Sequence, residues 1–260
     1  MPLEQDVPPI SGFTLRLFTR IVRRYFRSHF RSVMAQHAER LAAQSGPLIV
    51  YANHSSWWDP MISILLAQTL LPSCRHYAPM DADALARYPI LRKLGIFPVE
   101  MTTARGAAQF LRTGCAILRE GGVLWITPQG RFADPRAWPL AFKPGLAALA
   151  LRVPEATILP LAIEYTFWDE RLPEALLHVA ETVRLETGST TENATKQLET
   201  ALGAAMLSLQ KASIERDPHA FEPLLQGRRG TGGFYAFGRR LRAMLGGKKI
   251  QEDHTRRDKS

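Results

Sequence analysis

From residue 48 onward, short apolar runs alternate with longer stretches of helical periodicity, and this alternation constrains the fold more than any other feature. Strands are predicted at residues 48–52, 75–78, 96–99, 123–127 and 157–165, with a weaker candidate at 177–183. Helices are expected at 60–70, 81–94, 102–119 and 142–152, followed by a long amphipathic helix at 190–214. Such alternation is typical of chains in which helical crossovers connect parallel strands. We therefore expect an α/β fold with a mostly parallel central sheet flanked by helices.

The 260-residue length and 46% apolar content suit one full-sized globular domain with appended helices. Cys74 and Cys115 are the two cysteines, and neither lies in a C-x-x-C or histidine-rich context. The sequence therefore predicts no disulfide framework and no metal site, which fits a reducing compartment. The N-terminus lacks a basic region followed by an apolar stretch, and no run approaches the roughly 18 to 20 apolar residues of a membrane span. We expect a soluble or peripheral protein.

The formal net charge of +9 calls for an anionic partner, which phospholipid, nucleic acid or a phosphorylated substrate would satisfy. Residues 13–33 sort their basic and apolar side chains by helical period. The basic side chains fall within an arc of about 100° and are Arg16, Arg20, Arg23, Arg24, Arg27 and Arg31. Such an amphipathic helix suits an anionic lipid surface, and it equally suits a helix that packs on the domain and solvates its arginines. No nucleic-acid-binding motif accompanies the charge, so no nucleic-acid partner is expected.

The chain divides into three predicted regions. Residues 1–46 form an N-terminal amphipathic, membrane-surface helix region, and 47–215 form the α/β domain. Residues 216–260 form a basic C-terminal extension that is rich in Gly, Arg and Lys and is expected to be partly disordered.

The segment at residues 53–59 reads Asn-His-Ser-Ser-Trp-Trp-Asp and follows the first predicted strand. One interpretation is local, because Asp59 before Pro60 suits the N-cap of a helix. The other is chemical. His54 lies at the carboxyl end of a strand, where open α/β sheets bind ligands, and Asp59 can return around the turn to orient its imidazole. A histidine held in this way is a general base for a hydroxyl group.

The Asn-His-x4-Asp pattern of Asn53, His54 and Asp59 resembles the first motif of the glycerolipid acyltransferases, typified by the bacterial 1-acylglycerol-3-phosphate acyltransferases. Residues 95–101 are similar to the second motif, but Met101 stands where that motif has an arginine, and Arg105 is the nearest substitute.

Residues 127–132, Thr-Pro-Gln-Gly-Arg-Phe, are similar to the third motif, Phe-Pro-Glu-Gly-Thr-Arg. Gln129 replaces the glutamate, and Arg131 comes one position early. Lys143 belongs to a Phe-Lys-Pro-Gly run like the one that follows this loop in the family, and the proline-containing strand at 157–163 resembles the fourth motif. The resemblance covers about residues 41–165.

The resemblance implies that His54 deprotonates the acceptor hydroxyl and that Asp59 orients His54. The acyl group would come from acyl-CoA or acyl carrier protein as co-substrate, with no cofactor and no metal. The residues implied in substrate binding are Asn53, Arg105, Gln129, Gly130, Arg131 and Lys143. Backbone N–H groups around Gly130 are candidates for stabilising the oxyanion.

The acceptor implied is a lysophospholipid such as 1-acylglycerol-3-phosphate, in phospholipid biosynthesis or remodelling. The substitutions at Met101 and Gln129 leave room for another lipid alcohol or a glycolipid, and a non-catalytic lipid-binding protein of the same fold is the alternative class. The expected location is cytoplasmic, peripheral on the inner face of the cell membrane, with the phospholipid surface as partner. The sequence does not determine an oligomeric state.

Overall fold

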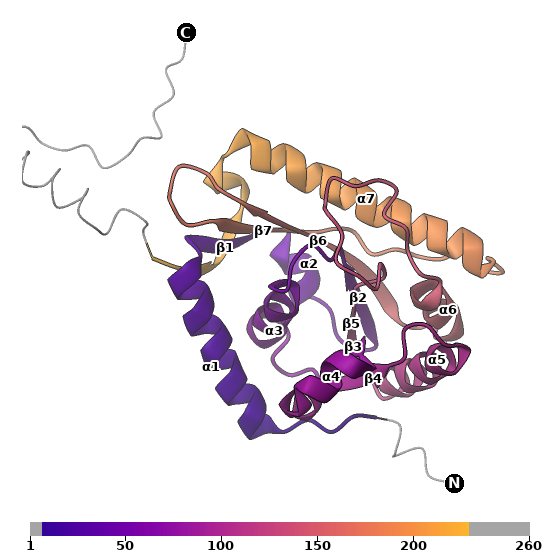
Figure 1. Cartoon of the computed structure of the whole chain (residues 1–260). Helices are drawn as coiled ribbons and strands as arrows, with labels where there is room; N and C mark the ends of the chain where they lie inside the picture. The colour runs from indigo at the N-terminus through magenta and orange to yellow at the C-terminus, as the bar shows by residue number, and fades with distance from the viewer. Residues whose placement is uncertain (1–6, 229–260) are drawn as a thin grey trace, which may run out of the picture.

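The computed structural model describes residues 7–228, which form one eight-stranded sheet with helices on both faces (Figure 1). The sheet order is β4-β3-β5-β2-β6-β7-β1-β8. The strands are β1 (Ser32–Gln36), β2 (Leu48–Ala52), β3 (His76–Asp81), β4 (Ile96–Val99), β5 (Val123–Ile126), β6 (Thr157–Thr166), β7 (Glu174–Val179) and β8 (Glu222–Gln226). The helices are α1 (Gly12–His29), α2 (Ala38–Ala42), α3 (Asp59–Leu70), α4 (Ala82–Arg87), α5 (Ala104–Arg119), α6 (Gly145–Arg152) and α7 (Thr191–Glu215), with short 3-10 turns η2 (Pro89–Lys93) and η3 (Pro218–Ala220).

The predicted α/β architecture is confirmed. Strands β4, β3, β5, β2 and β6 run parallel to one another, and β1 is parallel to β7. The antiparallel pairings are β6 with β7 and β1 with β8. The sheet is therefore mostly parallel.

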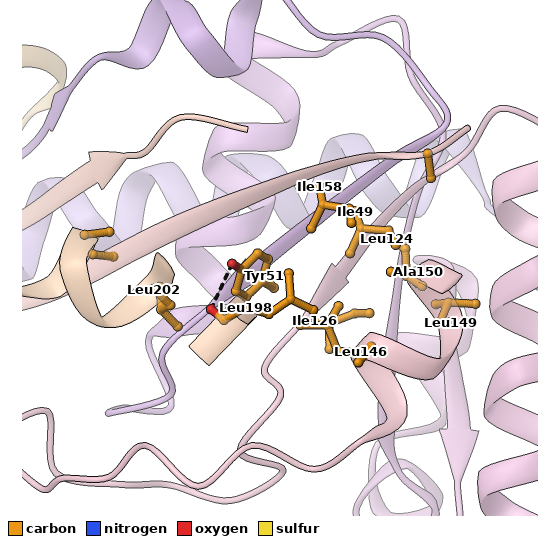
Figure 2. Close-up of a cluster of buried hydrophobic side chains, with 14 of the residues drawn as sticks. Ile49, Tyr51, Leu124, Ile126, Leu146, Leu149, Ala150, Ile158, Leu198 and Leu202 are labelled. Carbon is orange, nitrogen blue, oxygen red and sulfur yellow. Dashed lines mark hydrogen bonds between the residues drawn. The ribbon is translucent and has the colours of Figure 1, made fainter. Parts of the chain in front are cut away.

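The core has two layers, because alternate residues of each strand point to opposite faces of the sheet. Ile49, Tyr51 and Leu124 pack with side chains of α5, α6 and α7 (Figure 2). Leu48, Val50 and Val123 pack with α1, α2 and α3 on the other face. Figure 1 shows these two groups of helices on opposite sides of the sheet. Both faces of the central strands are buried, which explains their continuous apolar sequences.

The N-terminal helix is shorter than predicted, and the sheet extends beyond the predicted α/β domain at both ends. Helix α1 ends at His29, and residues 32–36 form β1 instead of a last helical turn. β1 lies between β7 and β8, so its apolar side chains are buried by pairings with residues more than 130 positions away. The boundaries predicted at 47 and 215 therefore exclude two strands that belong to the sheet.

Two smaller predictions need correction, and a third falls outside the described residues. The helix expected at 81–94 is α4 followed by the η2 turn, because Pro89 has no N–H to continue the helix. The strand expected at 177–183 begins earlier, at Glu174. The disorder predicted for the C-terminal extension concerns residues 229–260, which lie outside the described residues. Within 7–228, no helix is long and apolar enough to cross a membrane.

Candidate active site

The candidate site lies at the carboxyl ends of three adjacent parallel strands, β5, β2 and β6. His54 follows β2 by two residues, Gln129 follows β5 by three, and Tyr165 is near the end of β6. Parallel strands end at the same edge of a sheet, so the fold brings residues together that are far apart in the sequence. This edge is where ligands bind in open α/β sheets.

His54 and Asp59 form a hydrogen-bonded pair. His54 Nδ1 lies 2.8 Å from Asp59 Oδ2, and the side chains are 16% and 2% exposed, respectively. A carboxylate only accepts hydrogen bonds, so the neutral form of this imidazole carries its proton on Nδ1 and has a free lone pair on Nε2. Within residues 7–228, no hydrogen bond involves Nε2. The imidazole therefore has the orientation and tautomer of a general base.

The carboxylate of Asp59 does not cap the helix that it begins. The N-cap residue of α3 is Trp58, without a side-chain hydrogen bond, and Asp59 is the first helical residue. The Asp59 carboxylate instead accepts from His54 and from the backbone N–H of Ser56, at 3.0 Å. Of the two interpretations of this segment, the geometry favours the histidine–aspartate pair.

Tyr165 completes the surroundings of Asp59, and it was not predicted as a site residue from the sequence. Its hydroxyl donates to Asp59 Oδ1 at 2.7 Å. Burial and the nearby Asp59 charge raise the pKa of Tyr165 well above its usual value, so the phenol stays neutral and able to donate. The position of Tyr165 at the end of a strand next to β2 was a usable clue, although the sequence alone does not show where its side chain points.

Asn53 has a structural role instead of the predicted contact with substrate. Its Nδ2 donates to Ile163 O at 2.9 Å, and its Oδ1 accepts from Ile163 N at 2.8 Å. The side chain is buried, with 2% of the residue exposed. Asn53 therefore continues the pairing of β2 with β6 beyond the last residue of β2, and it fixes the backbone just before His54.

Gln129 is likewise committed to the protein backbone. Its Oε1 accepts from His54 N at 3.0 Å, and its Nε2 donates to Leu140 O at 3.2 Å. The residue is 5% exposed. An amide makes both bonds because it carries a donor and an acceptor, whereas an ionised glutamate has no donor for Leu140. The prediction that Gln129 contacts substrate is replaced by a role in connecting the β5 loop to the backbone of His54.

Gly130 lies in a close approach between the β5 loop and two other segments. Its φ is +62°, and an added Cβ would lie 2.8 Å from Met101 Cε and 3.0 Å from Lys143 Cε. The Lys143 ammonium lies 3.4 Å from Met101 O. Lys143 therefore reaches the position where the related motif has an arginine and this chain has Met101.

The remaining predicted cationic residues are exposed. Arg131 follows Gly130 in the β5 loop, and Arg105 lies in the first turn of α5. Among residues 7–228, no hydrogen bond joins Arg105 to the residues around His54. The structure thus brings Arg131 and Lys143 to one loop and leaves Arg105 on a separate helix.

Phe132 covers the imidazole of His54. The two ring centroids are 4.3 Å apart, and Ala133 N donates to His54 O at 2.8 Å. Phe132 is 59% exposed, so a large apolar side chain borders both the histidine and the solvent. No role was predicted for Phe132 from the sequence.

An aromatic cluster connects α1 to the turn that carries His54 and Asp59. Trp58 contacts Tyr25 and Phe30, with ring centroids 4.9 Å and 4.6 Å apart. Trp57 lies 5.8 Å from Tyr25 and is 55% exposed. The helix expected at the membrane surface is therefore packed directly against the candidate site.

The fold and the paired side chains define an α/β protein with a hydrogen-bonded histidine–aspartate pair at the sheet edge, and the comparisons with known proteins assign its family. The family model described as Acyltransferase matches residues 32–164, more than half of the chain. The chain belongs to this acyltransferase family. The matched region begins at β1 and ends within β6, and it contains His54, Asp59 and Gln129.

A solved structure shares the fold. It is the crystal structure of the 1-acyl-sn-glycerophosphate (LPA) acyltransferase PlsC from Thermotoga maritima, with a TM-score of 0.57 and 19% sequence identity. The similarity covers 75% of this chain and 79% of that one. A search of curated proteins gave no match.

Proposed function

We propose that this acyltransferase moves a fatty acyl group from acyl-CoA or acyl carrier protein to the hydroxyl of a lysophospholipid such as 1-acylglycerol-3-phosphate. The observation that carries the proposal is the His54–Asp59 hydrogen bond of 2.8 Å, which leaves Nε2 free to take a proton. Family membership supports the reaction type, and the named substrate of the Thermotoga maritima protein supports the acceptor class. The corresponding role is in phospholipid biosynthesis or remodelling.

The chemistry follows from the free nitrogen of His54. Nε2 takes the proton of the acceptor hydroxyl, and the oxygen attacks the thioester carbonyl to form a tetrahedral oxyanion. When the oxyanion collapses, the carbon–sulfur bond breaks and the proton on Nε2 passes to the thiolate that leaves. Asp59 stabilises the imidazolium between these two steps. No cofactor takes part in this sequence.

The oxyanion requires hydrogen-bond donors near His54. Gly130 N donates to Thr127 O at 3.0 Å, so this amide is already used in the turn. In the described part of the chain, the next two amides, those of Arg131 and Phe132, make no hydrogen bond. We propose these two as the donors, because Phe132 is in contact with the imidazole.

The phosphate of the acceptor or donor would bind at the cationic groups of the same loops. Arg131 supplies an exposed guanidinium, and Lys143 supplies an ammonium beside Gly130 and Met101. Arg105 is a third and more separate candidate. Met101 replaces the arginine of the related motif. The nearby Lys143 is a point charge and lacks the bidentate geometry of a guanidinium. Acylation of another lipid alcohol or a glycolipid is therefore the second candidate function.

Helix α1 is the proposed contact with the phospholipid surface. Its exposed side includes three large apolar residues, Phe13, Leu17 and Ile21, which are 72%, 50% and 52% exposed. Exposed arginines accompany them and are Arg16, Arg20, Arg24 and Arg27. Apolar and cationic side chains on one exposed face suit an anionic lipid interface. We propose a cytoplasmic location, peripheral on the inner face of the cell membrane.

The test is transfer of labelled acyl groups by the purified full chain to a panel of acceptors. The panel contains 1-acylglycerol-3-phosphate, lysophospholipids with larger headgroups, a glycolipid and simple lipid alcohols, each with acyl-CoA and with acyl carrier protein as donor. The proposal predicts a phosphate-bearing lysophospholipid as the best acceptor. Preference for an acceptor without phosphate would favour the second candidate, and no transfer from either donor would favour a non-catalytic lipid-binding protein.

A further inference from the structure

We infer that Tyr165 is a positioning residue that holds the Asp59 carboxylate in the orientation needed by His54. This inference rests on the proposed function, because it assigns a further residue to the same base. The Tyr165 hydroxyl donates to Asp59 Oδ1 at 2.7 Å, while His54 Nδ1 bonds the other oxygen, Oδ2. Tyr165 therefore acts on the base through Asp59, and within residues 7–228 no hydrogen bond joins Tyr165 to His54.

The two carboxylate oxygens of Asp59 have different sets of donors. Oδ2 accepts from His54 Nδ1 and from Ser56 N, at 2.8 Å and 3.0 Å. Among residues 7–228, Tyr165 is the donor seen at Oδ1. A buried charged oxygen without a hydrogen-bond donor is strongly disfavoured. Without the Tyr165 hydroxyl, the carboxylate would therefore lower its free energy by rotating or by sharing the donors of Oδ2. Either movement loosens the bond that fixes the imidazole.

The ring of Tyr165 is held in place independently of its hydroxyl. It lies at the end of β6 and contacts Phe30, with ring centroids 5.8 Å apart. Phe30 is 2% exposed and also contacts Trp58, the residue before Asp59. Removal of the hydroxyl alone therefore leaves the aromatic packing and removes the hydrogen bond, which makes Tyr165→Phe a specific test.

Tyr51 provides a matched control. Its hydroxyl is also buried and donates to Leu198 O at 3.0 Å, on the face of the sheet covered by α7 (Figure 2). Both phenylalanine variants delete one buried phenol hydrogen bond. Only the bond of Tyr165 reaches the residue that orients His54. A purely structural role would give the two variants the same consequences.

The experiment compares kcat, KM and thermal stability in wild type, Tyr165→Phe and Tyr51→Phe. We expect Tyr165→Phe to lower kcat roughly 10-fold with both KM values changed less than twofold, because the substrates still bind while the base is poorly oriented. Tyr51→Phe should lower the melting temperature and leave kcat within twofold. An unchanged kcat in Tyr165→Phe, or an equal loss of kcat in Tyr51→Phe, would overturn the inference.

A second readout does not depend on activity. The 15N shifts of the His54 ring, assigned by comparison with His54→Gln, report which ring nitrogen carries the proton. Wild type and Tyr51→Phe should show the Nδ1–H tautomer, and Tyr165→Phe should show a mixture of both. If wild type transfers no acyl group but Tyr165→Phe changes the tautomer, the proposed function fails while the positioning role stands. If the tautomer is the same in all three proteins, the positioning role fails.

Discussion

The backbone N–H of His54 donates to the side-chain oxygen of Gln129 at 3.0 Å, which ties the proposed base to the loop after the neighbouring strand. The same side chain donates to Leu140 O at 3.2 Å. The Gln129 side chain therefore lies between a donor and an acceptor, and its amide satisfies both at neutral pH, whereas an ionised carboxylate would not. The replacement of the related motif's glutamate by glutamine therefore has a structural explanation in these two hydrogen bonds.

Gln129→Glu should destabilise the protein by about 1–3 kcal/mol at pH 7, because the carboxylate loses the bond to Leu140 O and is buried. Protonation restores a donor, so the difference from wild type should narrow as the pH falls toward 5. Urea unfolding at pH 7 and pH 5 measures the difference in the free energy of unfolding between Gln129→Glu and wild type. Gln197→Glu is the control, since Gln197 Nε2 donates to Arg184 O in a more exposed bond. A stability deficit in Gln129→Glu that does not respond to pH would contradict this account.

Gly130→Ala tests whether the close approach of the β5 loop matters for substrate binding. Gly188 is the control, because both glycines have positive φ, +62° and +81°, but nothing lies within 4 Å of a Cβ added at Gly188. Both alanine variants should lose about 1–2 kcal/mol of stability from backbone strain. Only Gly130→Ala displaces Met101 and Lys143, so it alone should raise KM for the phosphorylated acceptor several-fold. Equal KM values in the two variants would remove Lys143 from the proposed phosphate site.

The four exposed arginines of α1 should be required for binding to anionic vesicles. Arg23 is not among them, because it is half-buried and donates to Thr69 Oγ1 at 3.0 Å. The α1 variant replaces Arg16, Arg20, Arg24 and Arg27 with glutamine. The control variant makes the same change at four exposed arginines outside α1, which are Arg119, Arg152, Arg171 and Arg184. Both variants lose four positive charges. Sedimentation with vesicles should show a large loss of binding in the α1 variant alone, and equal losses would indicate a non-specific effect of net charge.

His178 should make the protein less stable in mild acid. Burial, with the nearby charges of His37 and Arg40, lowers the pKa of His178 to about 4. The unfolded chain takes up this proton near pH 6.5 and the folded chain only near pH 4, so stability is lost as the pH falls between these values. The loss should be about 1–2 kcal/mol once solvent screening at this half-buried site is considered. Urea unfolding measures the free energy of unfolding at pH 7 and pH 5. The difference between the two pH values should be smaller in His178→Asn than in wild type, and an equal difference would assign the effect to other groups.

The strands predicted at residues 48–52 and 96–99 agree with the observed bounds of β2 and β4, since continuous apolar runs mark strands buried on both faces. Strand β1 was not predicted: its first two residues were included in the helix expected at 13–33, and its pairings with β7 and β8 are with distant segments. The sequence around residues 32–36 gives no indication of these long-range pairings.

The candidate site was predicted in part. His54 and Asp59 were identified because their spacing and their place after a strand constrain the chemistry. The amides of Asn53 and Gln129 suit a substrate and a backbone equally well, and only their buried positions distinguish the two roles. Tyr165 joins the site through strand order, since β6 lies beside β2.

The most direct test of the central claim is the rate of acyl transfer by His54→Gln beside wild type and His219→Gln, in which an exposed histidine of the η3 turn is replaced. Loss of a general base should lower kcat at least about 100-fold, as is usual for such groups, with the melting temperature nearly unchanged. His219→Gln should match wild type. A rate for His54→Gln within about tenfold of wild type would contradict the assignment of His54 as the base.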